Sequence, residues 1–124
     1  MCGVIGYIGD NDAPQKVYEG LKKLEYRGYD SCGISAPQNG KHALIRRVGP
    51  PSELVRCPRS EGKVQLDSTL AIGHTRWATH GKVTEANAHP HVSYCGKISI
   101  VHNGVIENAE ELKNFLIKDR GIEF

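Results

Sequence analysis

The sequence predicts an α+β fold, in which short strands are combined with two amphipathic helices. Two strand-like segments flank an Asn-Gly pair at residues 39–40, which is a strong β-hairpin signal. Residues 12–24 and 108–121 each combine a capping residue with apolar residues at helical spacing. A layered α/β arrangement fits the same pattern, and neither reading of the fold names a function by itself.

The first strand is expected over residues 3–8, which include Gly3 and Gly6. Glycine weakens a strand, so two of them suggest backbone that something approaches closely. The helix that follows is expected to start with Asp12 as its N-cap and Pro14 in its first turn. Its apolar stripe should face the core and consists of Val17, Leu21 and Leu24.

The hairpin strands are expected over residues 31–36 and 42–48. Residues 49–69 contain three prolines and several charges, and we expect a surface loop there with one helical turn at residues 52–56. Two further strands are expected over residues 70–74 and 97–101.

The second helix is expected to start at Asn108, with Glu111 completing a capping box, and to stop at Gly121. Its apolar face consists of Leu112, Phe115 and Leu116.

The composition is that of an ordinary soluble protein. Of its 124 residues, 39% are hydrophobic and 24% are charged, which argues against disorder. The net charge of +2 and the scattered basic residues favour neither a nucleic-acid nor a membrane partner. No apolar run approaches the roughly 20 residues of a membrane span, and a secretory signal is not evident. We therefore expect one cytoplasmic domain over residues 1–124.

The cysteines and histidines do not predict a disulfide framework or a metal site. The four cysteines are widely and unevenly spaced, and without a sign of secretion we expect reduced thiols. Cys32 is expected to be buried, and no role is assigned to it, to Cys57 or to Cys95. There is no Cys-x2-Cys pair and no convincing helical pair of histidines, so no metal or other cofactor is expected.

Cys2 is the first candidate catalytic residue. Initiator methionine is generally removed before a small side chain, which would make Cys2 the first residue of the mature chain. A terminal amine and a thiol both exchange protons close to neutral pH, so the amine can act as the base for its own nucleophile. Alone, the Met-Cys-Gly start is weak evidence, because an accidental and inert cysteine is the commoner case.

Two segments at strand ends supply the groups that such a nucleophile needs. Arg76 lies at the end of an apolar strand, and its planar guanidinium can bind a carboxylate. Asn103 and Gly104 follow a later strand and can offer side-chain and backbone N–H groups to an oxyanion. Each also has an ordinary interpretation, a surface salt bridge for Arg76 and a tight turn for the Asn-Gly pair.

Five motifs resemble those of the class II glutamine amidotransferases. Within that family they are most similar to the glutaminase domain of glucosamine-6-phosphate synthase, the glutamine–fructose-6-phosphate aminotransferase. The motifs are residues 2–6 (CGVIG), 24–31 (LEYRGYDS), 73–81 (GHTRWATHG), 87–91 (NAHPH) and 101–104 (VHNG). They stand in family order and span nearly the whole chain, and the second and third are characteristic of this branch.

The resemblance implies the four-layer αββα sandwich of the N-terminal-nucleophile (Ntn) hydrolases. It also implies the glutaminase half-reaction of glucosamine-6-phosphate synthesis. In that reaction Cys2 attacks the side-chain amide of glutamine and forms a γ-glutamyl thioester. The ammonia released serves the amination of fructose-6-phosphate, and water then releases glutamate.

The resemblance further implies roles for individual residues. Asn103 and Gly104 would hold the tetrahedral oxyanion beside the nucleophile. Arg76 would bind the α-carboxylate of glutamine, and Trp77 would lie on the loop that covers the substrate. Arg27 would support the surroundings of the nucleophile. The residues expected to bind glutamine are Arg76, Trp77, Thr79 and His80.

The match to the family covers only part of its glutaminase domain. In the family that domain is nearly twice as long and sugar-isomerase domains follow it, so residues 1–124 are expected to be truncated. The aspartate that binds the glutamine α-amino group in the family lies in the segment that would come next. An incomplete sheet would favour self-association or association with relatives that contain the sugar-isomerase domains.

Three functions remain open at this point. The first is an active glutaminase fragment, and the second is a non-catalytic fragment or remnant that acts at most by association with full-length relatives. The third, a different Ntn amide hydrolase, is least favoured, because Arg76 and Trp77 suit a free amino acid better than a peptide.

Overall fold

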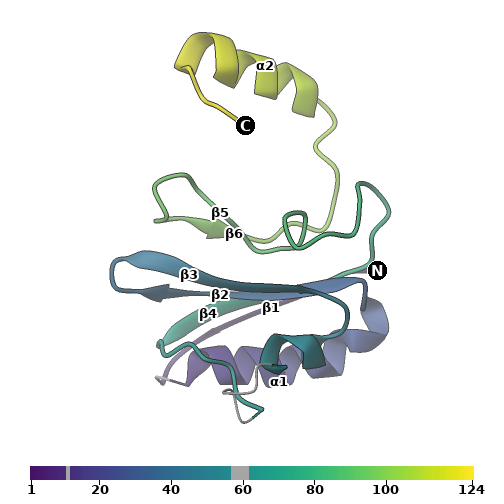
Figure 1. Cartoon of the computed structure of the whole chain (residues 1–124), viewed down its shortest axis with the longest axis vertical. Helices are drawn as coiled ribbons and strands as arrows, with labels where there is room; N and C mark the ends of the chain where they lie inside the picture. The colour runs from purple at the N-terminus through teal and green to yellow at the C-terminus, as the bar shows by residue number, and fades with distance from the viewer. Residues whose placement is uncertain (11, 57–61) are drawn as a thin grey trace.

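A four-stranded antiparallel sheet with one helix packed on it forms the centre of the molecule (Figure 1). The structure is a computed structural model that describes residues 1–10, 12–56 and 62–124. The elements in chain order are β1 (Gly3–Ile8), α1 (Ala13–Leu24), the 3-10 helix η1 (Glu25–Arg27), β2 (Ser31–Gln38), β3 (Lys41–Val48), the 3-10 helix η2 (Pro51–Val55), β4 (Leu70–Arg76), β5 (His91–Val92), β6 (Ser99–Ile100) and α2 (Ala109–Arg120).

The strand order β1-β4-β2-β3 brings three distant segments together at one edge of this sheet. In the antiparallel register Gly3 lies opposite Thr75, and Ser31 lies opposite Arg76. The start of β1 and the start of β2 therefore flank the end of β4. Cys2, which precedes β1, is placed beside the residues that follow β4.

Helix α1 covers one face of the sheet and supplies much of the core. Val17 and Leu21 are fully buried there, as predicted, whereas Leu24 is only partly buried. A Cβ atom at Gly73 would come within 2.5 Å of Val17 Cγ1, so glycine allows the helix to approach β4 closely. A similar closeness occurs at Gly3, where a Cβ would lie 2.7 Å from Thr75 Oγ1, but Gly6 has ordinary spacing.

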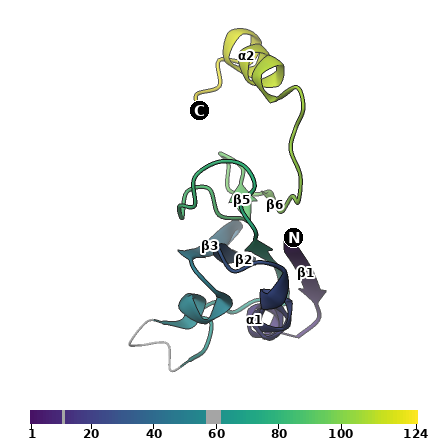
Figure 2. The same cartoon turned by 90° about the vertical axis from the view of Figure 1, so that its right-hand side faces the viewer.

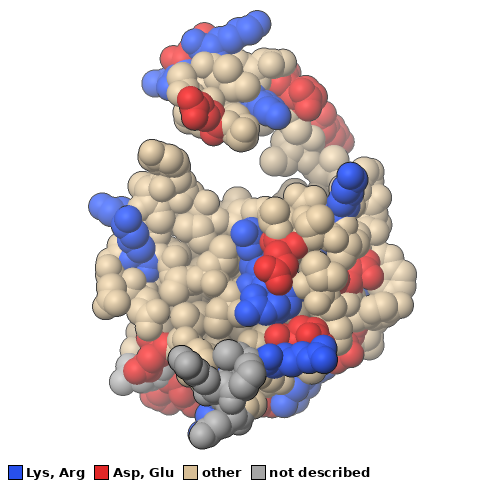
Figure 3. All heavy atoms as spheres, viewed as in Figure 1, with Lys and Arg blue, Asp and Glu red and all other residues tan. Residues whose placement is uncertain are grey.

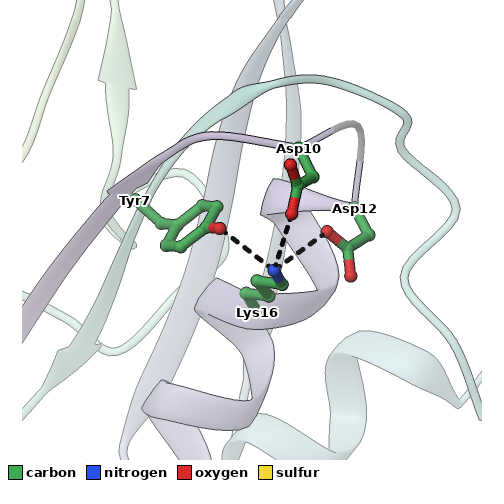
Figure 4. A network of polar contacts seen from close by, with 4 residues as sticks. All are labelled: Tyr7, Asp10, Asp12 and Lys16. Carbon is green, nitrogen blue, oxygen red and sulfur yellow. Dashed lines mark hydrogen bonds and ion pairs between the residues drawn. The ribbon is translucent and has the colours of Figure 1, made fainter.

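The turn between β1 and α1 is held by an exposed network of polar groups around Lys16 (Figure 4). Asp12 is the N-cap residue, as predicted, but its side chain makes no capping hydrogen bond. Its carboxylate instead pairs with Lys16 Nζ at 3.5 Å. Lys16 Nζ also donates to the Tyr7 hydroxyl at 3.0 Å and to Asp10 at 3.2 Å, contacts that raise the pKa of the ammonium group.

The β2–β3 hairpin confirms the prediction from the Asn-Gly pair. Asn39 and Gly40 both have positive φ, 53° and 79°, as a two-residue hairpin turn requires. Both strands reach this turn, so β2 is two residues longer than predicted. The fourth strand is also longer, because β4 continues to Arg76.

A two-stranded hairpin, β5–β6, lies on the face of the main sheet opposite α1, and α2 lies beyond it (Figures 1 and 2). The layers thus follow the order αββα, with two strands in the second sheet. The predicted strand over residues 97–101 is reduced to Ser99–Ile100. Strand β5 was not predicted, because two residues are too few to show an alternating pattern.

Helix α2 has the predicted bounds, but its predicted core face is wrong. No residue of α2 is buried, and Leu112 and Phe115 are 43% and 48% exposed. An open gap separates α2 from the surface below it, and side chains of both charges stand on the helix (Figure 3). Asn108 makes no side-chain capping bond, so the predicted capping box is not formed. Gly121 ends the helix at φ 62°, as predicted.

Candidate active site

Two adjoining hollows open where β1 begins and β4 ends. The small hollow, of about 120 Å³, is lined by Cys2, His74, Arg76, Trp77, Thr79, His80, His89, His102, Gly104 and Val105. The large hollow, of about 460 Å³, is lined by Met1, Cys2, Arg27, Trp77, Thr79, Asn103 and Gly104. The structure therefore brings all eight candidate residues around one site, although they come from four separate segments of the sequence.

Cys2 lies between the two hollows and contacts the backbone just after β4. The Trp77 N–H group donates to Cys2 Sγ at 3.3 Å, and the thiol lies 3.7 Å from the Trp77 carbonyl oxygen. Arg27 Nε donates to the Cys2 carbonyl oxygen at 3.3 Å. The backbone of Cys2 is thus held from η1, and its sulfur faces the end of β4.

The end of β4 is held in turn by residues 28–30, to which sequence reasoning gave no role. Asp30 N–H donates to the Arg76 carbonyl at 3.0 Å, and Asp30 Oδ2 accepts from Ala78 N–H at 2.8 Å. At Gly28 an added Cβ would lie 2.7 Å from the Arg76 carbonyl carbon, so only glycine fits there without displacement. Gly28 and Asp30 both belong to the motif over residues 24–31, but their contacts with the end of β4 form only in the folded chain.

Arg76 faces the small hollow without a carboxylate partner among the described residues. Its Nη1 donates to the carbonyl oxygens of Lys82 and Asn87 at 3.2 and 3.4 Å, and its Nη2 donates to that of His80. The surface salt bridge considered from the sequence is therefore not formed. The guanidinium is fixed by neutral groups and keeps its positive charge available to the hollow.

The loop over residues 80–88, which supplies these carbonyl groups, also accepts hydrogen bonds from a residue of β3. Arg46 Nη1 donates to the carbonyl oxygens of Ala86 and Ala88 at 3.2 and 3.1 Å. Arg46 lines neither hollow. It was not predicted to have a role, since nothing in the sequence links β3 to this loop.

Asn103 and Gly104 lie at the site in an open segment and not in a hydrogen-bonded turn. Asn103 Oδ1 lies 2.5 Å from His74 Nε2. The tight-turn interpretation of this Asn-Gly pair is therefore not what the structure shows. Both residues line the large hollow together with Cys2.

Three histidine rings, two of which line the small hollow, pack against one another. The ring centroids of His74 and His89 are 4.6 Å apart, and those of His89 and His91 are 4.5 Å apart. Burial and the neighbouring histidines lower the pKa of His89 to about 4, and burial lowers the pKa of His74 and His91 as well. Among the described residues, no three His, Cys, Asp or Glu side chains are placed to hold a metal ion.

These lowered pKa values predict that acid destabilises the fold before the carboxylates are protonated. As the pH falls below about 6.5, the unfolded chain binds protons at these histidines, while folded His89 resists protonation until about pH 4. The free energy of unfolding should therefore decrease over this interval by about 1–3 kcal/mol. Urea titrations at several pH values measure it. The decrease should be smaller in His89→Gln, and an identical decrease in that variant would contradict the assignment.

The remaining described cysteines lie outside the site. Cys32 is buried, and burial raises the pKa of its thiol to about 12, as expected for an inert core residue. Cys95 is exposed, and a hydrogen bond with Ser93 lowers the pKa of its thiol. Cys2, Cys32 and Cys95 are all free thiols. Cys57 lies outside the described residues.

Within the described chain, neither α-helix has the length and apolar character needed to cross a membrane. No protein-family model matches the sequence. The chain is nevertheless similar to several enzymes named glutamine–fructose-6-phosphate aminotransferase (isomerizing). It is 51% identical to that of Pyrococcus horikoshii over 118 residues, 95% of this chain and 19% of the relative. It is 48% identical to that of Chlamydia trachomatis over 124 residues, 100% of this chain and 20% of the relative.

Two solved structures share both the fold and part of the sequence. One is the glutamine phosphoribosylpyrophosphate amidotransferase of B. subtilis with ADP and GMP, with a TM-score of 0.77 and 30% identity. The other is described as an allosteric regulatory enzyme of purine biosynthesis, with a TM-score of 0.79 and 31% identity. Each match covers 100% of this chain and 26% of the other.

The chain spans about a fifth of the length of the curated relatives it matches. The matches in sequence agree with the αββα layers and with the matches in structure. The chain therefore belongs to the class II glutamine amidotransferases, with the Ntn-hydrolase fold, and corresponds to the N-terminal glutaminase domain of the glutamine–fructose-6-phosphate aminotransferases.

Proposed function

We propose that this chain carries out the glutaminase half-reaction of glucosamine-6-phosphate synthesis, hydrolysing the side-chain amide of glutamine. The observation that carries the proposal is the small hollow, in which Cys2, Arg76 and Gly104 surround one space. A nucleophile, a carboxylate anchor and an oxyanion donor are what the hydrolysis of a free amino acid's amide requires. The relatives' shared name, glutamine–fructose-6-phosphate aminotransferase, points to the same substrate.

In this proposal Met1 is removed and Cys2 becomes the terminal residue. The contact from Arg27 to the Cys2 carbonyl does not involve Met1 backbone atoms, so it can hold the new terminus in place. The free α-amine then accepts the thiol proton, directly or through one water molecule. Loss of that proton leaves a thiolate at the border of the two hollows.

The thiolate attacks the side-chain amide carbon of glutamine, and the carbonyl oxygen becomes an oxyanion. Asn103 Nδ2 and the Gly104 N–H would stabilise this charge. When the C–N bond breaks, the nitrogen takes the proton from the ammonium group of Cys2 and leaves as ammonia. Water then attacks the γ-glutamyl thioester, and breakage of the C–S bond releases glutamate and restores the thiol.

Arg76 is proposed to bind the α-carboxylate of glutamine, since it lines the small hollow and forms no ion pair among the described residues. Thr79 and His80 lie on the same loop and would shape the pocket around the bound amino acid. Trp77 borders both hollows and packs edge-on against Tyr29 at 5.8 Å between ring centroids. It would exclude water from the thioester until ammonia has left.

The proposal is tested by measuring glutamate release from glutamine by the purified chain, after intact mass has shown that Met1 is absent. The expected result is release that saturates with glutamine. A matched form with one lysine inserted between Met1 and Cys2 should be inactive, because it leaves no amine on Cys2. Failure of the wild-type chain to release glutamate would favour the alternative of a non-catalytic fragment.

We also propose that residues 1–124 act as a domain that associates through α2, with itself or with relatives that contain sugar-isomerase domains. The exposed side chains of Leu112, Phe115 and Ile117 on α2 support this. Sedimentation of the chain should show a mass that increases with concentration. The variant Phe115→Asp should weaken this association, whereas a single monomeric species at all concentrations would contradict self-association.

A further inference from the structure

The buried side chain of His74 has no role in the proposed chemistry, yet it contacts one of the proposed oxyanion donors. His74 lies in β4, and its neighbour Gly73 faces α1. Successive residues of a strand point to opposite faces, so His74 points toward the site side of the sheet. It is only 1% exposed, and its Nε2 atom lies 2.5 Å from Asn103 Oδ1.

This contact fixes which nitrogen of His74 carries the proton. An amide oxygen can only accept a hydrogen bond, so Nε2 must be the donor. Burial keeps the ring neutral by lowering its pKa, as does the nearby Arg76 guanidinium. A neutral ring has a single N–H, so Nδ1 is left as a lone pair, and Nδ1 has no partner among the described residues.

The same contact fixes the orientation of the Asn103 amide. With Oδ1 bound to His74, the NH2 group of the amide must point away from β4. No described residue accepts a hydrogen bond from Asn103 Nδ2, and Asn103 lines the large hollow next to Cys2. Without His74, rotation of the amide by half a turn would exchange the donor and the acceptor. An oxygen aimed at the reacting carbonyl would repel the oxyanion.

We propose that His74 is a positioning residue that locks the Asn103 amide with its NH2 group directed at the oxyanion. This inference rests on the proposed glutaminase function, because it assigns His74 a role only through Asn103. His74 borders the small hollow but is only 1% exposed, and this scheme gives it no bond to the nucleophile or to the reacting carbonyl. The residue should therefore affect the rate of acylation and not the binding of glutamine.

The test is a double-mutant cycle between His74 and Asn103. We expect His74→Leu to lower kcat for glutamate release about tenfold at unchanged KM, by loss of one orienting hydrogen bond. Asn103→Ala should lower kcat about 100-fold or more. In the Asn103→Ala background, His74→Leu should change kcat by less than about twofold, since coupled residues are not additive. His74→Gln, whose amide N–H can replace Nε2–H, should recover most of the activity.

Alkylation of Cys2 by iodoacetamide separates positioning from a general loss of structure. This displacement occurs at a methylene carbon and forms no oxyanion, so His74→Leu should alkylate at the wild-type rate, with exposed Cys95 as an internal reference. Equal slowing of alkylation and turnover would overturn the proposal, as would the same fold-loss of kcat in both Asn103 backgrounds. If Asn103→Ala itself leaves kcat unchanged, the oxyanion assignment within the proposed function has failed instead.

If the variants do not fold or turnover is absent, the proposed hydrogen bond between His74 and Asn103 can still be tested on the unaltered protein. Nitrogen-15 NMR of the histidine side chains distinguishes the two neutral tautomers. We expect His74 to be neutral at pH 7 with its proton on Nε2. A proton on Nδ1 would show that Asn103 presents its NH2 group to His74, which would overturn the proposal.

Discussion

Replacing Cys2 by alanine is expected to reduce glutamate release to the background rate, a loss of about 10⁴-fold or more. The variant keeps the terminal amine, Arg76 and the oxyanion donors but has no group that can form the thioester. The fold should survive, because the side chain of Cys2 is only partly buried and, among the described residues, its hydrogen bonds are with Trp77 alone. The matched control is Cys95→Ala, which removes an exposed thiol that lines neither hollow.

Comparing these two variants tests whether activity depends on the thiol at position 2 and not on any thiol of the chain. Cys95→Ala should release glutamate at the wild-type rate, and its unfolding midpoint should match that of Cys2→Ala. A Cys2→Ala variant that still turns over glutamine would show that another group is the nucleophile. Loss of activity in both variants would point to a disturbed fold and would not support the assignment of Cys2.

Replacing Arg76 by lysine is expected to lower kcat/KM for glutamine by about 30- to 4000-fold, mainly through KM. Lysine keeps the charge but cannot present two parallel N–H groups to a carboxylate. It also cannot hold the three carbonyl groups of the loop that Arg76 contacts. Loss of one partner of a buried charged contact typically costs about 2–5 kcal/mol, which sets this range.

Two controls separate carboxylate binding from support of the loop. Arg46→Lys loosens the same loop from β3 but does not reach either hollow, so it should change KM much less. A substrate analogue that lacks the α-carboxylate should react with wild type and Arg76→Lys at similar kcat/KM. A variant that loses as much with the analogue as with glutamine would contradict the assignment of Arg76 to the carboxylate.

The elements of the fold that depend on local signals could be predicted from the sequence. The Asn39-Gly40 turn, the start of α1 with Pro14 in its first turn and the end of α2 at Gly121 follow from backbone preferences of single residues. The environment of α2 could not be predicted, since its apolar stripe is the same whether or not another element covers it. Strand β5 was missed because its two residues pair only through a long-range contact with β6.

For the candidate site, the sequence likewise predicts which residues take part, but not the contacts between distant segments that hold them. Residue type and motif were enough to select the eight candidates, and the antiparallel register of β1 and β4 explains why they meet. The supporting contacts of Gly28, Asp30 and His74 depend on distances between chain segments that no local pattern contains. Why these three residues occur in the motifs can be explained only once the residues that they contact in the fold are known.

In the proposed reaction Cys2 becomes the terminal nucleophile and carries the glutamyl group. This role of Cys2 is tested most directly by quenching the protein in acid during turnover of glutamine and measuring its intact mass and that of its first peptide. We expect a chain without Met1 that carries one glutamyl group on Cys2, removable by hydroxylamine. Glutamate release by a chain that retains Met1, or a glutamyl group attached elsewhere, would contradict it.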